Sequence, residues 1–186
     1  MNAKNYSRDA LRIWIHSGWY TPEQVNLMLH DVIEDSDDEQ ALREFIRAEF
    51  EMRDSDEETW PNETDCDRLD RAFAAISSQG IVALQNAGYT TSDGHEEVGD
   101  VLAPHPRGTF KGYCFYHGQD LERVVNTGQL YVAFGDLQDT QEGKLAIGRL
   151  VRDAVRGEGL ACDWNDDVDK RILITGIDWK RRRPNE

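Results

Sequence analysis

The hydrophobic pattern changes at Thr64, and this change constrains the fold more than any other feature. From there on, helical patterns alternate with short apolar runs, which lie at 81–86, 110–116 and 130–134. Repeated strand-helix-strand units predict right-handed crossovers and a largely parallel sheet. The runs at 110–116 and 130–134 are apolar on both alternating faces, which is typical of central strands covered by helices on both sides.

Two more apolar runs, at 160–164 and 171–177, are joined by a short acidic turn and predict a β-hairpin. The expected class is therefore α/β, with a mixed, largely parallel sheet, helical crossovers and a C-terminal β-hairpin. The connection from His117 to Gln129 is near the minimum length of a crossover. If it is not a crossover, the sheet is more antiparallel.

The first third of the chain has helical periodicity. Thr21 with Gln24, and Ser36 with Glu39, have the spacing of capping boxes at helix starts. We expect a helical N-terminal portion, an acidic linker and an α/β core domain, which span residues 1–53, 54–63 and 64–186.

Acidic residues are concentrated in one segment. The chain has 21 basic and 36 acidic residues and a formal charge of −15; residues 31–70 hold 17 of the acids and four arginines. This balance disfavours nucleic-acid binding and adsorption to anionic membranes. The segment is either a solvated helix face with a linker or a docking surface for a basic protein partner. The single basic cluster, at 179–183, is either solvated or contacts an acidic partner, an RNA end or the chain's own acidic segment.

The hydrophobic pattern of the sequence predicts neither a membrane span nor a signal peptide. No apolar run is long enough to span a bilayer, and the polar N-terminus does not resemble a signal peptide. The widely spaced cysteines Cys66, Cys114 and Cys162 predict reduced thiols in a cytosolic protein.

Polar side chains gather in three loops that follow the predicted strands. In a parallel sheet these loops would share one edge and form a site for a small polar ligand or a metal. The candidate residues are Asn86, Tyr89, Ser92, Asp93, His95, His117, Gln119, Asp120 and Asp136. The alternative is that many of them are turn and cap residues. We further expect His95 and His117 to share one site.

Complete catalytic, metal or cofactor motifs are missing from the sequence. Cys114 and His117 are three apart on a strand and point to opposite faces, so a nucleophilic pair is disfavoured. The run from Asp163 begins like a calcium loop, but Val168 stands where glycine is needed and Ile174 where glutamate is needed. No glycine-rich phosphate loop or paired-cysteine zinc motif occurs, so no particular cofactor is indicated.

Four long segments resemble an uncharacterised bacterial family known as a domain of unknown function (DUF6891). They are TDCDRLDRAFAA (64–75), GIVALQNAGYTTSDG (80–94), GYCFYHGQDLER (112–123) and LYVAFGD (130–136). The resemblance covers nearly the whole chain and implies a bacterial cytoplasmic protein. It implies no activity, cofactor or catalytic residue.

Two functions follow from these patterns. The first is a non-enzymatic interaction or regulatory module that uses the acidic surface to bind a basic protein. The second is a small-ligand or metal site, catalytic or sensory, at the loops around His95 and His117. The oligomeric state is not indicated.

Overall fold

A computed structural model describes residues 6–183 and divides the chain into two compact units. Within the described residues, the N-terminal unit comprises 6–64 together with 179–183. The α/β unit comprises 65–178. Each unit is described by itself.

The N-terminal unit is helical, and two of its helices begin where a polar side chain caps them. Its elements are α1 (Tyr6–Ser17), α2 (Pro22–Met28), a short 3-10 helix η2 (Leu29–Asp31) and α3 (Glu39–Glu57). The predicted capping box of Thr21 and Gln24 is confirmed. The predicted cap of α3 is wrong by two residues: Asp38, not Ser36, accepts the amide of Ala41 at 3.1 Å. Helix α3 also continues into the stretch expected to be a linker.

The apolar faces of these helices form one core. Its buried members are Leu11, Ile15, Val25, Leu29, Val32, Leu42, Ile46 and Phe50. The helical spacing of these residues therefore accounts for the packing of the unit.

The basic C-terminal segment packs within the N-terminal unit. The Arg181 guanidinium lies 4.4 Å from the centre of the Trp19 ring, and buried Arg53 donates a hydrogen bond to the Arg181 carbonyl. Arg183 pairs with Asp54 at 2.5 Å. The basic cluster at 179–183 therefore contacts the chain's own acidic segment, which is one of the alternatives that the sequence left open.

The α/β unit places five strands between helices. In chain order its elements are α4 (Asp65–Ser78), β1 (Ile81–Leu84), α5 (Thr91–Leu102), β2 (Gly112–Phe115), α6 (Gly118–Thr127), β3 (Leu130–Asp136), α7 (Gln141–Gly157), β4 (Ala161–Asp163) and β5 (Ile172–Thr175). The strand order is β1-β2-β3-β5-β4. The α/β class, the mixed sheet and the C-terminal hairpin are confirmed.

The sheet is less parallel than expected. Only the pair β1–β2 is parallel, whereas β2–β3, β3–β5 and β5–β4 are antiparallel. The connection between β2 and β3 is near the minimum length of a crossover. Helix α6 fills this connection without returning the chain to the opposite edge of the sheet, so β3 runs antiparallel to β2.

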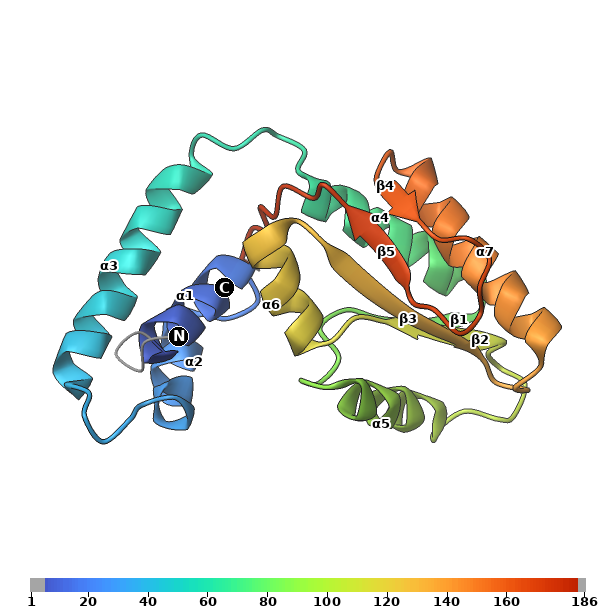
Figure 1. The fold of residues 1–186 in the computed structure, drawn as a ribbon, viewed down its shortest axis with the longest axis horizontal. Coiled ribbons are helices and arrows are strands. Elements are labelled where there is room, and N and C mark those ends of the chain that lie inside the picture. Colours follow the sequence, from blue (N-terminus) through green and yellow to red (C-terminus); the bar gives the residue numbers. More distant parts are fainter. Residues whose placement is uncertain (1–5, 184–186) are drawn as a thin grey trace. The chain divides into compact units, whose positions relative to one another are not determined.

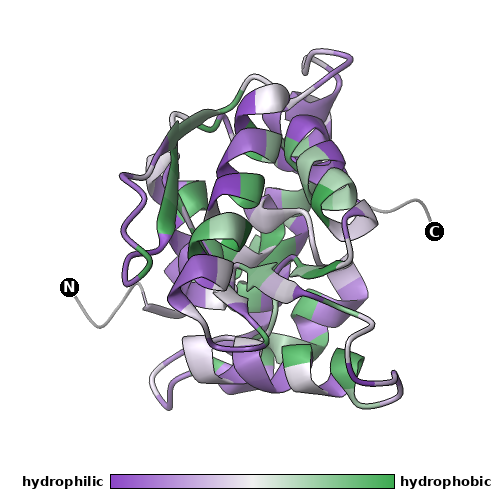
Figure 2. Ribbon diagram, turned by 90° about the vertical axis from the view of Figure 1, so that its right-hand side faces the viewer, coloured by the Kyte–Doolittle hydropathy of each residue, from purple (hydrophilic) through white to green (hydrophobic). Residues whose placement is uncertain are grey.

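Helices cover both faces of the sheet. Helix α5 lies on one side of the strands, and α4 and α7 lie on the other (Figure 1). Phe115 faces α5, where its ring leaves no room for a side chain at Gly94. Tyr116, the next residue, faces the opposite side and packs edge-on against Phe73 of α4. The apolar strands lie between helices that carry polar residues on their outer surfaces (Figure 2).

Candidate functional site

The loops that follow β1 and β2 meet at one edge of the sheet. Gly118 donates its amide to the Gly88 carbonyl at 2.9 Å, and Gln119 donates to the Tyr89 carbonyl at 3.1 Å. The parallel pairing of β1 and β2 sets this arrangement. The structure thus brings the first two predicted loops together.

A polar cluster with two buried members lies where these loops meet. The side chains of His117 and Asp120 are each only 3% exposed, and Nε2 of His117 lies 3.1 Å from Oδ2 of Asp120. Arg171 directs Nη1 at both carboxylate oxygens of Asp120, at 2.9 and 2.8 Å. The Thr91 hydroxyl lies 3.1 Å from Nε2 of His117. We call these four residues the His117 cluster.

Burial sets the charge state of His117. Removal from water lowers the pKa of His117 below 6.5; nearby Asp120 opposes this shift and nearby Arg171 adds to it. The ring is therefore neutral at pH 7. Within residues 6–183, its Nδ1 atom is buried and has no hydrogen-bond partner.

Several predicted site residues serve as caps or turns. Asp93 is the third helical residue of α5 and accepts the amides of Thr90 at 2.8 Å and Tyr89 at 3.2 Å, which holds the pKa of its carboxyl below the usual range. Asn86 has a left-handed backbone with φ of 53°. These roles match the turn-and-cap alternative. Ser92 and the Gln119 side chain are exposed.

The exposed aromatic and imidazole side chains of this region contact different groups. Tyr89 is 53% exposed and donates its hydroxyl to Glu122 at 3.0 Å. His95 is exposed and lies edge-on to the rings of Tyr113 and Phe115, with centroids 5.2 and 5.1 Å away. In the described part of the chain no hydrogen bond or ring contact joins His95 to His117. A site shared by both histidines stays a prediction.

The placement of Asp136 in the same loop cluster is wrong. Because β3 is antiparallel to β2, Asp136 pairs in register with Gly112 at the opposite edge of the sheet. Its carboxylate accepts the amide and hydroxyl of Thr140 at 3.0 and 2.8 Å, immediately before α7.

Sequence reasoning missed Arg171 and Thr91. The sequence signal for Arg171 was its position directly before the apolar strand β5. A cation at such a position must find either a partner or solvent. Its partner, Asp120, is 51 residues away, and local spacing cannot predict such a pair. Thr91 was hidden among the turn residues of its loop.

The other predicted chemistry has little support in the structure. Cys114 is fully buried, and burial raises the pKa of its thiol. Residues 6–183 contain no group of three or more His, Cys, Asp and Glu side chains placed to hold a metal ion. The metal interpretation of the loop cluster therefore lacks a ligand set within these residues.

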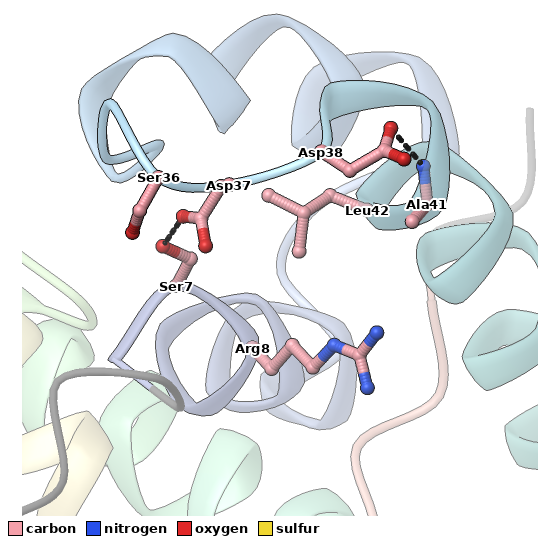
Figure 3. Close-up of a pocket in the computed structure, with 7 residues that line it drawn as sticks. All are labelled: Ser7, Arg8, Ser36, Asp37, Asp38, Ala41 and Leu42. Carbon is pink, nitrogen blue, oxygen red and sulfur yellow. Dashed lines mark hydrogen bonds between the residues drawn. The ribbon is translucent and has the colours of Figure 1, made fainter.

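In the N-terminal unit, part of the acidic segment has structural roles. A pocket of about 140 Å³ lies where α1 meets the start of α3 (Figure 3). At this pocket Asp37 accepts the Ser7 hydroxyl at 2.6 Å, and Asp38 caps α3. Both carboxylates are thus engaged in holding the fold.

The outward side of α3 is different. Glu44, Glu51 and Glu58 are exposed and follow one another at intervals of seven residues, which aligns them along one side of the helix and its C-cap. Between them lie exposed Ala48 and Met52, the latter 53% exposed. Among the described residues, Glu51 is the one of these three carboxylates that pairs with a cation, Arg47 at 3.2 Å. We call these five residues, with Ser55, the acidic face of α3.

The chain was compared with known protein families. The model of the family described as "Domain of unknown function (DUF6891)" matches residues 1–183. The chain belongs to the DUF6891 family. The predicted resemblance to DUF6891 is thereby confirmed over nearly the whole chain. No curated protein and no solved structure shows a significant match. Among the described residues of this DUF6891 member, no helix is both long and apolar enough to cross a membrane.

Proposed function

We propose that this protein is a non-enzymatic interaction module that binds a basic segment of a partner protein through the acidic face of α3. The observation that carries the proposal is the line of exposed carboxylates at Glu44, Glu51 and Glu58, to which a single cation is paired within residues 6–183. Successive carboxylates are two helical turns apart, about 10 Å along the axis. Regularly spaced cations of a partner would match this spacing.

The composition of the face also suits a protein partner. Ala48 and Met52 offer apolar contact between the carboxylates, and methionine adapts to different partner surfaces. The surrounding charge, concentrated in residues 31–70, would steer a basic partner toward the face and raise the association rate.

The chain's own basic segment shows how arginine side chains can contact α3. Arg183 already pairs with Asp54 on another side of α3, and its guanidinium lies 5.1 Å from the centre of the Phe50 ring. An arginine-rich segment is thus compatible with this helix, while the acidic face keeps its carboxylates exposed.

The test uses a short oligo-arginine peptide as the probe. The triple variant Glu44→Gln, Glu51→Gln, Glu58→Gln should weaken binding about tenfold or more, since each lost charge pair contributes up to about 1 kcal/mol. The matched control neutralises three exposed carboxylates of α5, through Glu96→Gln, Glu97→Gln and Asp100→Asn. Equal loss in both variants would mean that the peptide responds to net charge alone and would overturn the proposal.

A second candidate function is a small-ligand site at the loops around His117. It is supported by the His117 cluster, in which the 37% exposed Arg171 side chain lies beside the buried side chains of His117 and Asp120. Its test is the ring signal of His117 in nuclear magnetic resonance spectra during titration with small polar metabolites. An unchanged signal throughout would count against this candidate.

A further inference from the structure

Two arginines from different elements converge on one tyrosine in the α/β unit. The guanidinium carbon of Arg171, beside β5, lies 5.0 Å from the centre of the Tyr131 ring. The guanidinium carbon of Arg123, on α6, lies 5.4 Å from the same centre. We propose that this arginine pair binds a phosphate-type oxyanion, either free phosphate or the phosphate group of a small ligand.

The pair carries more positive charge than its neighbours neutralise. Both guanidinium carbons lie near one ring, so no more than about 11 Å separates them. Asp120 neutralises Arg171. Arg123 is exposed, and its guanidinium has no hydrogen bond or ion pair in the part of the chain that the structure describes. The position next to Arg123 thus favours an anion, although the chain as a whole is acidic.

Arg171 is held in place through one of its nitrogen atoms, and its other N–H groups can donate hydrogen bonds to a ligand. Its contacts with Asp120 and His117 all leave from Nη1. Its side chain is 37% exposed. Within residues 6–183, Nε and Nη2 make no hydrogen bond, so they remain for a ligand oxygen. Because the buried carboxylate and the Tyr131 ring already restrict the side chain, an anion would lose little entropy in ordering it.

The chemistry of the groups selects the class of ligand. A guanidinium presents two parallel N–H donors, which match two oxygens of a phosphate or carboxylate. Arg123 adds a positive charge that Asp120 does not neutralise, and this excess charge favours a more highly charged oxyanion. Phosphate approaches two negative charges near neutral pH and acetate carries one, so we expect phosphate to bind more tightly than acetate.

Calorimetric titration of the full chain at constant ionic strength tests this ranking. The probes are inorganic phosphate, phenyl phosphate and acetate, and chloride sets the baseline. We expect both phosphates to bind more tightly than acetate. Phenyl phosphate binding more tightly than inorganic phosphate would identify a small phosphorylated ligand as the source, whereas equal or weaker binding would identify free phosphate.

The deciding variant is Arg123→Gln, which removes an exposed cation whose guanidinium has no hydrogen bond or ion pair within the described residues. It should weaken phosphate binding about tenfold, the loss of one charge-assisted contact. The control Arg107→Gln makes the same charge change at another exposed position of this unit and should leave binding unchanged. Absence of phosphate binding by the unmodified chain, or equal binding by both variants, would overturn the proposal. Neither substitution alters the acidic face of α3, so this result is independent of the proposed function.

Discussion

Arg171 and Asp120 join the start of β5 to the first turn of α6 through two short hydrogen bonds, although 51 residues separate them in the chain. The Asp120 side chain is 3% exposed and that of Arg171 is 37% exposed. The half-buried Arg171 guanidinium therefore neutralises the buried Asp120 carboxylate. It also links the His117 cluster to the arginine pair at Tyr131.

Removal of the Arg171 charge should destabilise the α/β unit. Arg171→Met leaves the Asp120 carboxylate buried without its cation, and we expect a loss of about 2–4 kcal/mol in the free energy of unfolding. The control Arg149→Met breaks an exposed pair with Asp166 and should cost less than about 1 kcal/mol. Urea unfolding measures both, and similar small losses would contradict a structural role for the Arg171–Asp120 pair.

Two glycines of α5 should respond oppositely to alanine. At Gly94 a Cβ atom would collide with the ring of Phe115, so Gly94→Ala should cost about 1–3 kcal/mol. Gly99 has open space around it, and Gly99→Ala should stabilise the unit by about 0.5–1 kcal/mol because alanine favours the helix. Thermal unfolding compares the pair. Stabilisation by both substitutions would show that α5 does not pack this closely on β2.

The depressed pKa of His117 predicts a specific pH dependence. Well above pH 6.5 the ring is neutral in both the folded and the unfolded state, so it contributes no pH dependence there. As the pH falls below 6.5, the unfolded state binds a proton before the folded state does, and stability decreases. In nuclear magnetic resonance titrations the His117 ring should titrate below pH 6.5. His117→Gln should flatten the loss of stability between about pH 6.5 and 5. An unchanged slope in the variant would contradict this account.

Cys114 should react slowly with a thiol reagent in the folded protein. It is fully buried, and burial raises the pKa of its thiol, so little thiolate forms. Cys162 is half-buried and should be labelled first. Mass spectrometry of time points under native conditions assigns the order. Rapid labelling of Cys114 would restore its interpretation as a nucleophile.

Local patterns predicted most elements of the fold. The box of Thr21 and Gln24 and the apolar spacing around Leu42 depend on neighbours within a few residues, and sequence displays such neighbours directly. The direction of β3 depends instead on how far α6 carries the chain. The short connection between β2 and β3 could be read from the sequence, but the antiparallel pairing of these strands could not. Asp136 was therefore predicted at the wrong edge of the sheet.

The candidate site was predictable only where it depended on the parallel pair. The loops around Tyr89 and His117 follow β1 and β2, so their meeting followed from topology. Arg171 comes from the hairpin and reaches Asp120 across β3, a contact between distant segments. Similarly, the cap at Asp38 replaced the one expected at Ser36 because side-chain geometry, not spacing alone, decides which residue caps.

The salt dependence of oligo-arginine binding tests the central claim most directly. Surface charges are screened over about 10 Å at 0.1 M salt, so affinity for the acidic face of α3 should fall steeply as salt rises. The association rate should fall more than the dissociation rate rises. The triple variant at Glu44, Glu51 and Glu58 should show a shallower dependence than the α5 control. Affinity that is unchanged between low and high salt, or identical slopes for the two variants, would contradict the account.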